Sequence, residues 1–108
     1  MPRPTDPISP FARRVYEALS AVPPGRVITY AALAREIGCR SPRAVGQALR
    51  ANPFAPEVPC HRVIASDLTP GGFFGRKSGP QLARKLRLLA SEGIRFENNR
   101  LADPARVL

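Results

Sequence analysis

Residues that build metal sites and disulfide frameworks are scarce in this chain. Its 108 residues include two cysteines, Cys39 and Cys60, and a single histidine, His61. A structural zinc site takes four cysteine or histidine ligands, so three candidates are too few for one chain. Two cysteines do not make a disulfide framework, and in a reducing cytosol both are expected to be free thiols. The sequence therefore predicts no metal and no cofactor.

Long apolar runs are also missing. No stretch approaches the ~20 apolar residues that a membrane span requires. The proline-rich start, MPRPTDPISP, has no apolar segment of the kind found in signal peptides. We therefore expect an intracellular protein, cytoplasmic or, in a eukaryote, nuclear, with no membrane partner.

Acidic residues are few, and the balance of charge indicates a partner. There are 17 Lys and Arg against 8 Asp and Glu, which gives a net charge of +9, and all of these cations except Lys77 and Lys85 are arginines. Arginine pairs bidentately with phosphate and stacks on bases. The composition thus favours a nucleic acid as the partner.

The length fits one domain with a modest core, and a hydrophobic content of 44% favours a folded chain. We expect a flexible arm over residues 1–9, a folded domain over 10–97 and a C-terminal tail over 98–108. The stretch SPFARRVYEALSAV predicts a first helix, with Ser9 as its cap and Pro10 in its first turn.

Two short helices are predicted next, roughly Tyr30–Ile37 and Pro42–Ala51, with Thr29 and Ser41 as their caps. A tight turn containing Gly38 joins them, which is the outline of a helix-turn-helix.

The second half of the chain predicts a small β component. NPFAPEVP is too rich in proline for a regular helix or a central strand, so it forms a stiff loop. CHRVIA then predicts a short strand, and a Gly-rich basic loop follows it. Pro80 opens a last helix, with Leu82, Leu86 and Leu89 on one face, and IRFE predicts a further strand. The fold class is mainly α with a small β component, a winged helix-turn-helix.

The adjacent Cys60 and His61 raise the question of chemistry. A thiol attacks as thiolate, and a free cysteine has a pKa of ~8.5, so a reactive cysteine needs a base nearby. Neighbours on a strand point to opposite faces. Direct contact between the two side chains therefore requires a turn, which Pro59 favours, and otherwise a water bridges them. Asp67, Glu57 and Glu92 are candidates to orient the histidine. The alternative is a small buried cysteine beside a structural histidine.

Several motifs in one order resemble the O6-alkylguanine-DNA alkyltransferases. VPCHRVIA resembles the active-site signature of that family, GRVITYAALA the entry to its helix-turn-helix, RAVGQALRANP its recognition helix and LLASEG its closing helix. The resemblance runs from about Phe11 to Phe96. It implies the fold of the family's C-terminal domain and a monomer that binds double-stranded DNA containing O6-alkylguanine.

The resemblance also implies roles in catalysis. Cys60 would be the nucleophile that takes the alkyl group from guanine O6 in a single displacement. His61 would act as the base through water, with Glu92 orienting it. Asn52 would brace the turn that holds the cysteine, and Tyr30 would help rotate the nucleotide out of the duplex and bind the guanine.

Further roles concern the DNA. Arg43 would fill the gap left in the base stack, Val63 would hold the base through its backbone, and small residues would let the recognition helix approach the minor groove. The DNA-contacting set implied by the resemblance is Tyr30, Arg43, Ala44, Gly46, Gln47, Val63 and Phe73. Phe73 and Phe74 stand where relatives often have a tyrosine followed by a small or hydroxylated residue, which implies that a side-chain contact to the lesion is lost while the aromatic ring keeps the pocket wall.

Two alternatives remain beside alkyl transfer. The domain that usually precedes this one is not found, so the chain also resembles the single-domain alkyltransferase-like proteins. Those bind alkylated guanine without repairing it and recruit nucleotide excision repair proteins. Because Cys60 is retained, we expect transfer. A winged-helix transcription factor is the third possibility, and it would require a sequence-specific site.

Overall fold

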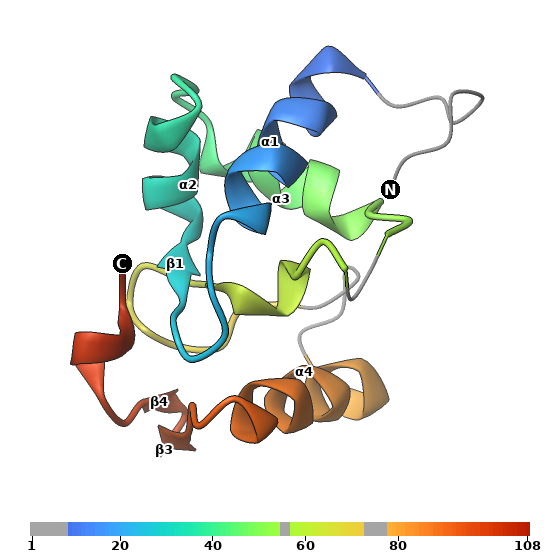
Figure 1. The fold of residues 1–108 in the computed structure, drawn as a ribbon. Helices are drawn as coiled ribbons and strands as arrows, with labels where there is room; N and C mark the ends of the chain where they lie inside the picture. The colour runs from blue at the N-terminus through green and yellow to red at the C-terminus, as the bar shows by residue number, and fades with distance from the viewer. Residues whose placement is uncertain (1–8, 55–56, 73–77) are drawn as a thin grey trace.

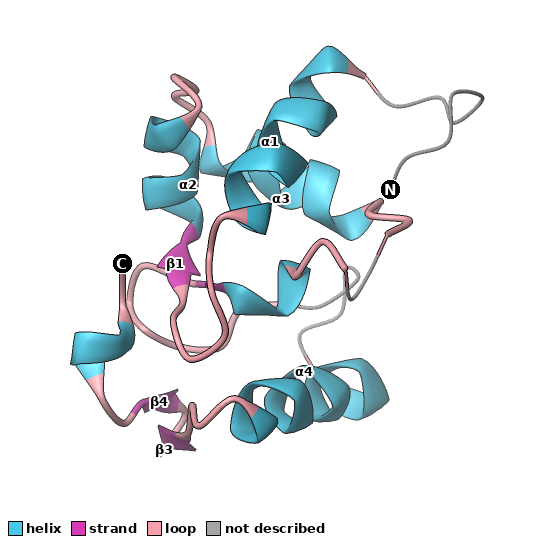
Figure 2. Cartoon of the chain, viewed as in Figure 1, coloured by secondary structure: helices cyan, strands magenta, loops and turns pink. Residues whose placement is uncertain are grey.

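The computed structural model describes residues 9–54, 57–72 and 78–108. The α-helices are α1 (Pro10–Ser20), α2 (Tyr30–Glu36), α3 (Pro42–Arg50) and α4 (Gly79–Ser91), and the short 3₁₀ helices are η1 (Cys60–Arg62) and η2 (Pro104–Arg106). The strands are β1 (Ile28–Thr29), β2 (Val63–Ile64), β3 (Phe96–Glu97) and β4 (Arg100–Leu101) (Figures 1 and 2). The predicted class, mainly α with a small β component, is confirmed.

The first three helices begin at the predicted caps. The hydroxyl oxygens of Ser9, Thr29 and Ser41 accept hydrogen bonds from the backbone N–H three residues later, at 3.0, 3.1 and 3.1 Å. Each cap gives a partner to one N–H that the helix itself cannot satisfy. Gly38, with a φ of +71°, makes the turn between α2 and α3. This local chemistry produces the helix-turn-helix.

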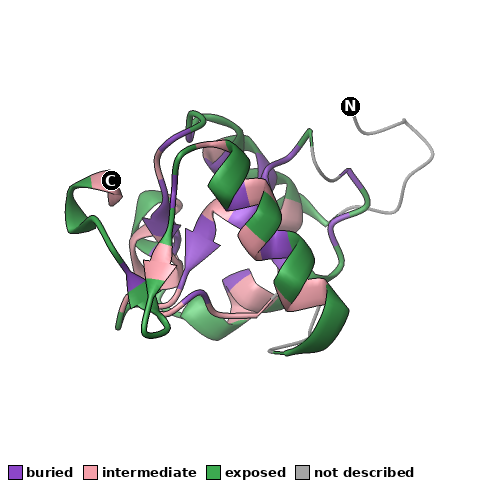
Figure 3. Ribbon diagram, turned by 90° about the horizontal axis from the view of Figure 1, so that it is seen from below, coloured by how far each residue is buried: buried purple, intermediate pink, exposed green. Residues whose placement is uncertain are grey.

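An apolar cluster joins α1, α2 and α3. Val15, Leu33 and Val45, one from each helix, have no exposed surface. Tyr16 of α1 packs edge-on against the Phe54 ring. Its hydroxyl donates to the carbonyl of Ala48 in α3 at 2.7 Å. Figure 3 shows the buried stretches between the helices and the exposed ones on their outer turns. The packing therefore fixes the position of α3 relative to α1.

A smaller cluster holds the second half of the chain. Strand β1 pairs in parallel with β2, with Ile28 opposite Val63. Strands β3 and β4 form a hairpin whose turn residues, Asn98 and Asn99, have φ of 51° and 62°, the conformation that a tight hairpin turn requires. The buried members of this cluster are Val27, Ile64, Leu89, Ile94 and Leu101. Helix α4 and the C-terminal residues are therefore joined to β1 and β2 through one core.

The expected strand at CHRVIA is wrong in its first half. Pro59 has φ −82° and ψ 68°, the geometry of an inverse γ-turn, and the N–H of Cys60 donates to the Val58 carbonyl at 2.8 Å. Residues Cys60–Arg62 then form η1, and the strand begins only at Val63. The Cys60 and His61 side chains therefore do not alternate between the two faces of a strand.

Candidate active site

Asn52 connects the end of α3 to the turn that carries the cysteine. Its side chain is buried; Nδ2 donates to the Val58 carbonyl at 3.0 Å, and Oδ1 accepts the Phe54 N–H at 2.9 Å. The Val58 carbonyl is the same one that receives the N–H of Cys60. One amide side chain therefore ties the helix, the proline-rich loop and the cysteine turn together.

Cys60 lies in a buried position, 6% exposed, in the same cluster as Val45 and Leu49 of α3. Burial raises the pKa of the thiol, while a hydrogen bond from Asn52 and the positive charges of Lys85 and Arg84 oppose that rise. Because the pKa stays raised, the neutral thiol predominates at neutral pH. Attack by Cys60 thus requires a group that removes its proton.

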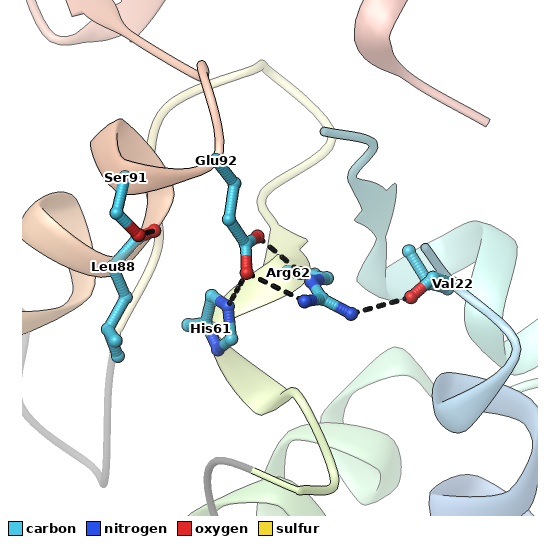
Figure 4. Close-up of polar contacts among 6 residues, drawn as sticks. All are labelled: Val22, His61, Arg62, Leu88, Ser91 and Glu92. Carbon is cyan, nitrogen blue, oxygen red and sulfur yellow. Dashed lines mark hydrogen bonds and ion pairs between the residues drawn. The ribbon is translucent and has the colours of Figure 1, made fainter. Parts of the chain in front are cut away.

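His61 is the adjacent group that can do this. Its side chain is 3% exposed, and Nε2 lies 3.1 Å from Oε2 of Glu92 at the end of α4 (Figure 4). Burial lowers the pKa of His61, and the contact with Glu92 offsets only part of that shift, so the imidazole is neutral at pH 7. Nε2 must carry the proton to donate to the carboxylate. Nδ1 is then the basic atom, and it is buried without a hydrogen-bond partner among the described residues.

Arg62 holds Glu92 from the other side. Its Nε and a terminal nitrogen donate to the two carboxylate oxygens at 2.9 and 2.6 Å, and its other terminal nitrogen donates to the Val22 carbonyl at 2.8 Å (Figure 4). Burial favours the neutral acid, but the hydrogen bonds from Arg62 and His61 outweigh it and hold the pKa of Glu92 below its ordinary value. Glu92 is therefore an anion locked in one orientation toward the imidazole.

Among the three carboxylates considered from the sequence, the structure places Glu92 against the histidine. Asp67 instead accepts hydrogen bonds from the N–H and the hydroxyl of Thr69, at 3.1 and 2.7 Å, within its own turn. Glu57 is exposed.

Tyr30 begins α2 and faces the loop that follows β2. Its hydroxyl donates to the Gly72 carbonyl at 3.5 Å. Gly71 has φ +72°, and a Cβ on it would stand 3.1 Å from the Tyr30 ring, so this close approach requires glycine. Burial, and then negative charge on Cys60, raise the pKa of the Tyr30 hydroxyl. A neutral phenol that can donate a hydrogen bond therefore lies within the electrostatic reach of the thiol.

The outer face of α3 carries the residues assigned to DNA. Arg43 and Gln47 are exposed, four residues apart on the helix, and Arg50 continues the same stripe. Ala44 and Gly46 are half-buried. Val45 and Leu49 face the core instead. The helix thus presents one cationic and polar stripe to solvent.

Two of the remaining assignments stand differently. Val63 is buried, and its carbonyl accepts a hydrogen bond from Lys85 at 2.7 Å. Phe73 and Phe74 lie outside the described residues.

Sequence reasoning missed Lys85 and Arg62 as parts of this site. Their signals were the position of Lys85 between Leu82 and Leu89 on the apolar face of α4, and an arginine directly after the Cys-His pair.

No metal-binding group of three or more His, Cys, Asp or Glu occurs in the described ranges 9–54, 57–72 and 78–108. Within those ranges, every helix is too short or too polar to cross a bilayer.

The fold and the site together define a winged helix-turn-helix protein with a buried thiol beside a histidine–glutamate pair. Residues 10–94 match the family model described as 6-O-methylguanine DNA methyltransferase, DNA binding domain. The chain belongs to this family.

Individual relatives carry different names. The chain is 51% identical over 86 residues to the DNA base-flipping protein of Thermus thermophilus, which covers 80% of the chain and 54% of that protein. It is 44% identical over 87 residues to the methylated-DNA–protein-cysteine methyltransferase of Methanothermobacter thermautotrophicus. This match covers 81% of the chain and 46% of that protein. The chain spans about half the length of these curated relatives.

A solved structure matches over a larger share of both chains. It is S. pombe Atl1 in complex with damaged DNA containing O6-carboxymethylguanine, with a TM-score of 0.80 and 29% identity, covering 95% of this chain and 98% of that one.

Proposed function

We propose that this protein repairs DNA by transferring an alkyl group from O6 of guanine to the sulfur of Cys60. The observation that carries the proposal is the buried His61, which is held through Nε2 by the Glu92 carboxylate and whose Nδ1 has no hydrogen-bond partner among the described residues. A base oriented by a carboxylate is what a buried, high-pKa thiol needs in order to act as a nucleophile.

The proposed step balances as a single displacement. The thiol proton passes to Nδ1 of His61, directly or through one water, and the Glu92 anion stabilises the imidazolium that forms. The sulfur then bonds to the alkyl carbon as the bond between that carbon and O6 breaks. The electron pair of the broken bond stays on guanine. The Tyr30 hydroxyl donates a hydrogen bond to a ring nitrogen of guanine as negative charge develops there. The Cys60 thiol is not regenerated from the product thioether, so each chain acts once.

The proposed substrate is double-stranded DNA, and the target base must leave the stack to reach Cys60. Arg43 occupies the vacated position, while Ala44 and Gly46 allow α3 to lie close to the minor groove. Gln47 contacts the groove beside them. We propose that residues 10–97 carry the DNA-binding and active-site residues. We also propose that the protein acts as a monomer, in the cytoplasm or, in a eukaryote, in the nucleus.

Support for these DNA contacts comes from the exposed stripe on α3 and from the match to Atl1 in its complex with damaged DNA. We also assign to Val63 a backbone contact with the flipped base and to Phe73 a place in the pocket wall.

A titration of protein against lesion tests the proposal. A fixed amount of duplex carrying one O6-methylguanine is incubated with increasing protein, and the remaining lesion is measured. We expect the lesion to disappear in proportion to added protein, one per chain, and to persist with Cys60→Ser. The matched control, Cys39→Ser, removes the other thiol and leaves the titration unchanged.

The same titration separates transfer from recognition alone. A lesion sensor that recruits nucleotide excision repair proteins would bind the duplex tightly, with or without Cys60, and leave the lesion intact at every protein concentration. We do not favour this function, because the thiol and its oriented base are both present.

A further inference from the structure

Lys85 is a buried cation that the proposed reaction does not use. It lies on the inner face of α4 and has no exposed surface. Its Nζ donates to the carbonyls of Val63, Pro70 and Gly72, at 2.7, 2.6 and 2.9 Å. Among the described residues, no carboxylate forms an ion pair with it. Burying a charge costs free energy unless hydrogen bonds compensate it, so the three carbonyls must offset the cost of burying this ammonium group.

The three acceptors match the three N–H groups of an ammonium. A neutral amine has two N–H groups and a lone pair, and it would leave one of the three carbonyls facing that lone pair. The complete cluster therefore requires the protonated form. Burial lowers the pKa of Lys85 to about 7, so the third N–H is present below neutral pH and is lost above it.

The carbonyls in this cluster come from the segments that border the thiol. Val63 directly follows η1, the turn that carries Cys60. Pro70 and Gly72 flank Gly71, which packs against the Tyr30 ring. The Gly72 carbonyl also receives the Tyr30 hydroxyl. The loop 70–72 is thus held by Lys85 from α4 and by Tyr30 from α2.

We propose that Lys85 is a positioning residue for alkyl transfer: its ammonium group holds the Val63 carbonyl and the 70–72 loop together as one wall beside the Cys60 thiol. The inference rests on the proposed function, because the wall matters only if an alkylated base is presented to that thiol. The Val63 carbonyl keeps a second lone pair, which remains available to the amino group of a bound guanine.

The charged and titratable groups around Lys85 support the same role. From η1, negative charge on Cys60 raises the pKa of Lys85, and the cation in turn lowers the pKa of the thiol. The Lys85 charge also lowers the pKa of His61, which keeps that imidazole neutral. From α2, Tyr30 shares the Gly72 carbonyl, and Arg84 is the neighbouring cation on α4 itself. Lys85 therefore favours both the thiolate and the neutral base.

The test compares Lys85→Met with Arg87→Met, which removes the same charge from the exposed side of α4. Single-turnover transfer is followed at saturating protein on duplex carrying one O6-methylguanine, from pH 6 to about pH 9. Duplex affinity is measured separately in the Cys60→Ser background, with and without Lys85→Met. We expect Lys85→Met to slow transfer by about tenfold or more below pH 7 and to change affinity by less than about threefold, with Arg87→Met within about twofold throughout.

The pH profile distinguishes positioning from bulk stability. The ratio of wild-type to Lys85→Met rates should fall as pH rises through about 7, because wild-type Lys85 then loses its third N–H. A ratio near one, or one that does not change with pH, overturns the inference. A wild type that forms no adduct overturns the proposed function instead, so the two failures are distinguishable.

A second measurement needs no variant and covers the case in which Lys85→Met does not fold. The Ala65 amide donates to the Thr69 carbonyl at 3.1 Å, between the Val63 and Pro70 carbonyls that Lys85 binds. Hydrogen exchange of this amide in the wild-type protein, corrected for intrinsic exchange, should show protection that decreases as pH rises through about 7. Protection that stays constant across that range contradicts the positioning role of Lys85.

Discussion

Replacing Glu92 by glutamine tests the histidine–glutamate pair with almost no change in shape. Oε2 accepts hydrogen bonds from His61 and from Arg62, and Oε1 accepts a second one from Arg62. The amide of glutamine has one oxygen and one NH₂ group. In either orientation of the amide, an N–H donor faces another donor, and the guanidinium loses its anion.

The size of the effect follows from these contacts. The Glu92 side chain is 15% exposed, so its bonds are largely protected from water. A hydrogen bond to a charged group is worth ~1.5–3 kcal/mol, and we expect Glu92→Gln to lower the free energy of unfolding by about 2 kcal/mol. For transfer, His61 remains but its imidazolium loses the facing charge. We expect a 10- to 100-fold slower step, equivalent to about 1.4–2.8 kcal/mol at the barrier.

The pH dependence gives the sharper readout. His61 accepts the thiol proton only when neutral, and burial lowers its pKa from 6.5, so the wild-type rate should fall as the pH drops below 6.5. On the alkaline side, the wild-type rate should decline as Lys85 loses its third N–H at about pH 7. Glu92 raises the pKa of His61, so its removal lowers that pKa further and weakens the base. Transfer by Glu92→Gln then depends on ionisation of Cys60 itself, whose pKa is raised, and its rate should keep rising above pH 8.

The assay is single-turnover transfer to the protein at saturating concentration, measured over this pH range. Asp67→Asn is the matched control, since it removes an exposed carboxylate that contacts only Thr69 among the hydrogen-bond partners described. If Glu92→Gln gives the same rate and the same pH profile as Asp67→Asn, the account of the base is refuted.

Two further predictions concern α3. Asn52→Ala should lower the free energy of unfolding in urea by about 1–3 kcal/mol, because the buried Phe54 N–H loses its acceptor, and it should slow transfer because the cysteine turn loses its brace. Unchanged transfer would mean that Asn52 only stabilises the fold. Arg43→Ala should weaken binding to lesion duplex more than to intact duplex. Arg50→Ala should weaken both alike and lower the slope of log affinity against log salt by about one. Equal losses and equal slopes in the two variants would mean that Arg43 acts through its charge alone.

The features predicted from sequence are those encoded by near neighbours in the chain. Caps at Ser9, Thr29 and Ser41 act on an N–H three residues away, and Gly38 acts on its own backbone. The residue pattern alone therefore places the helix-turn-helix to within about two residues at each end.

Long-range contacts could not be predicted in this way. The burial of Lys85 depends on carbonyls 13 to 22 positions away in the sequence. The contacts of Arg62 could not be predicted either, because its partners lie 30 and 40 residues away in the sequence. A lysine on the apolar face of α4 was a visible anomaly, but only the folded structure shows what it binds.

The central claim is that Cys60 accepts the alkyl group, and the most direct measurement is the mass of the peptide that contains it. Protein incubated with duplex carrying O6-methylguanine is digested, and the Cys60 and Cys39 peptides are compared in the same spectrum. We expect one added methyl group on the Cys60 peptide and none on the Cys39 peptide. Lesion duplex bound by the protein with both peptides at their unmodified mass would contradict it.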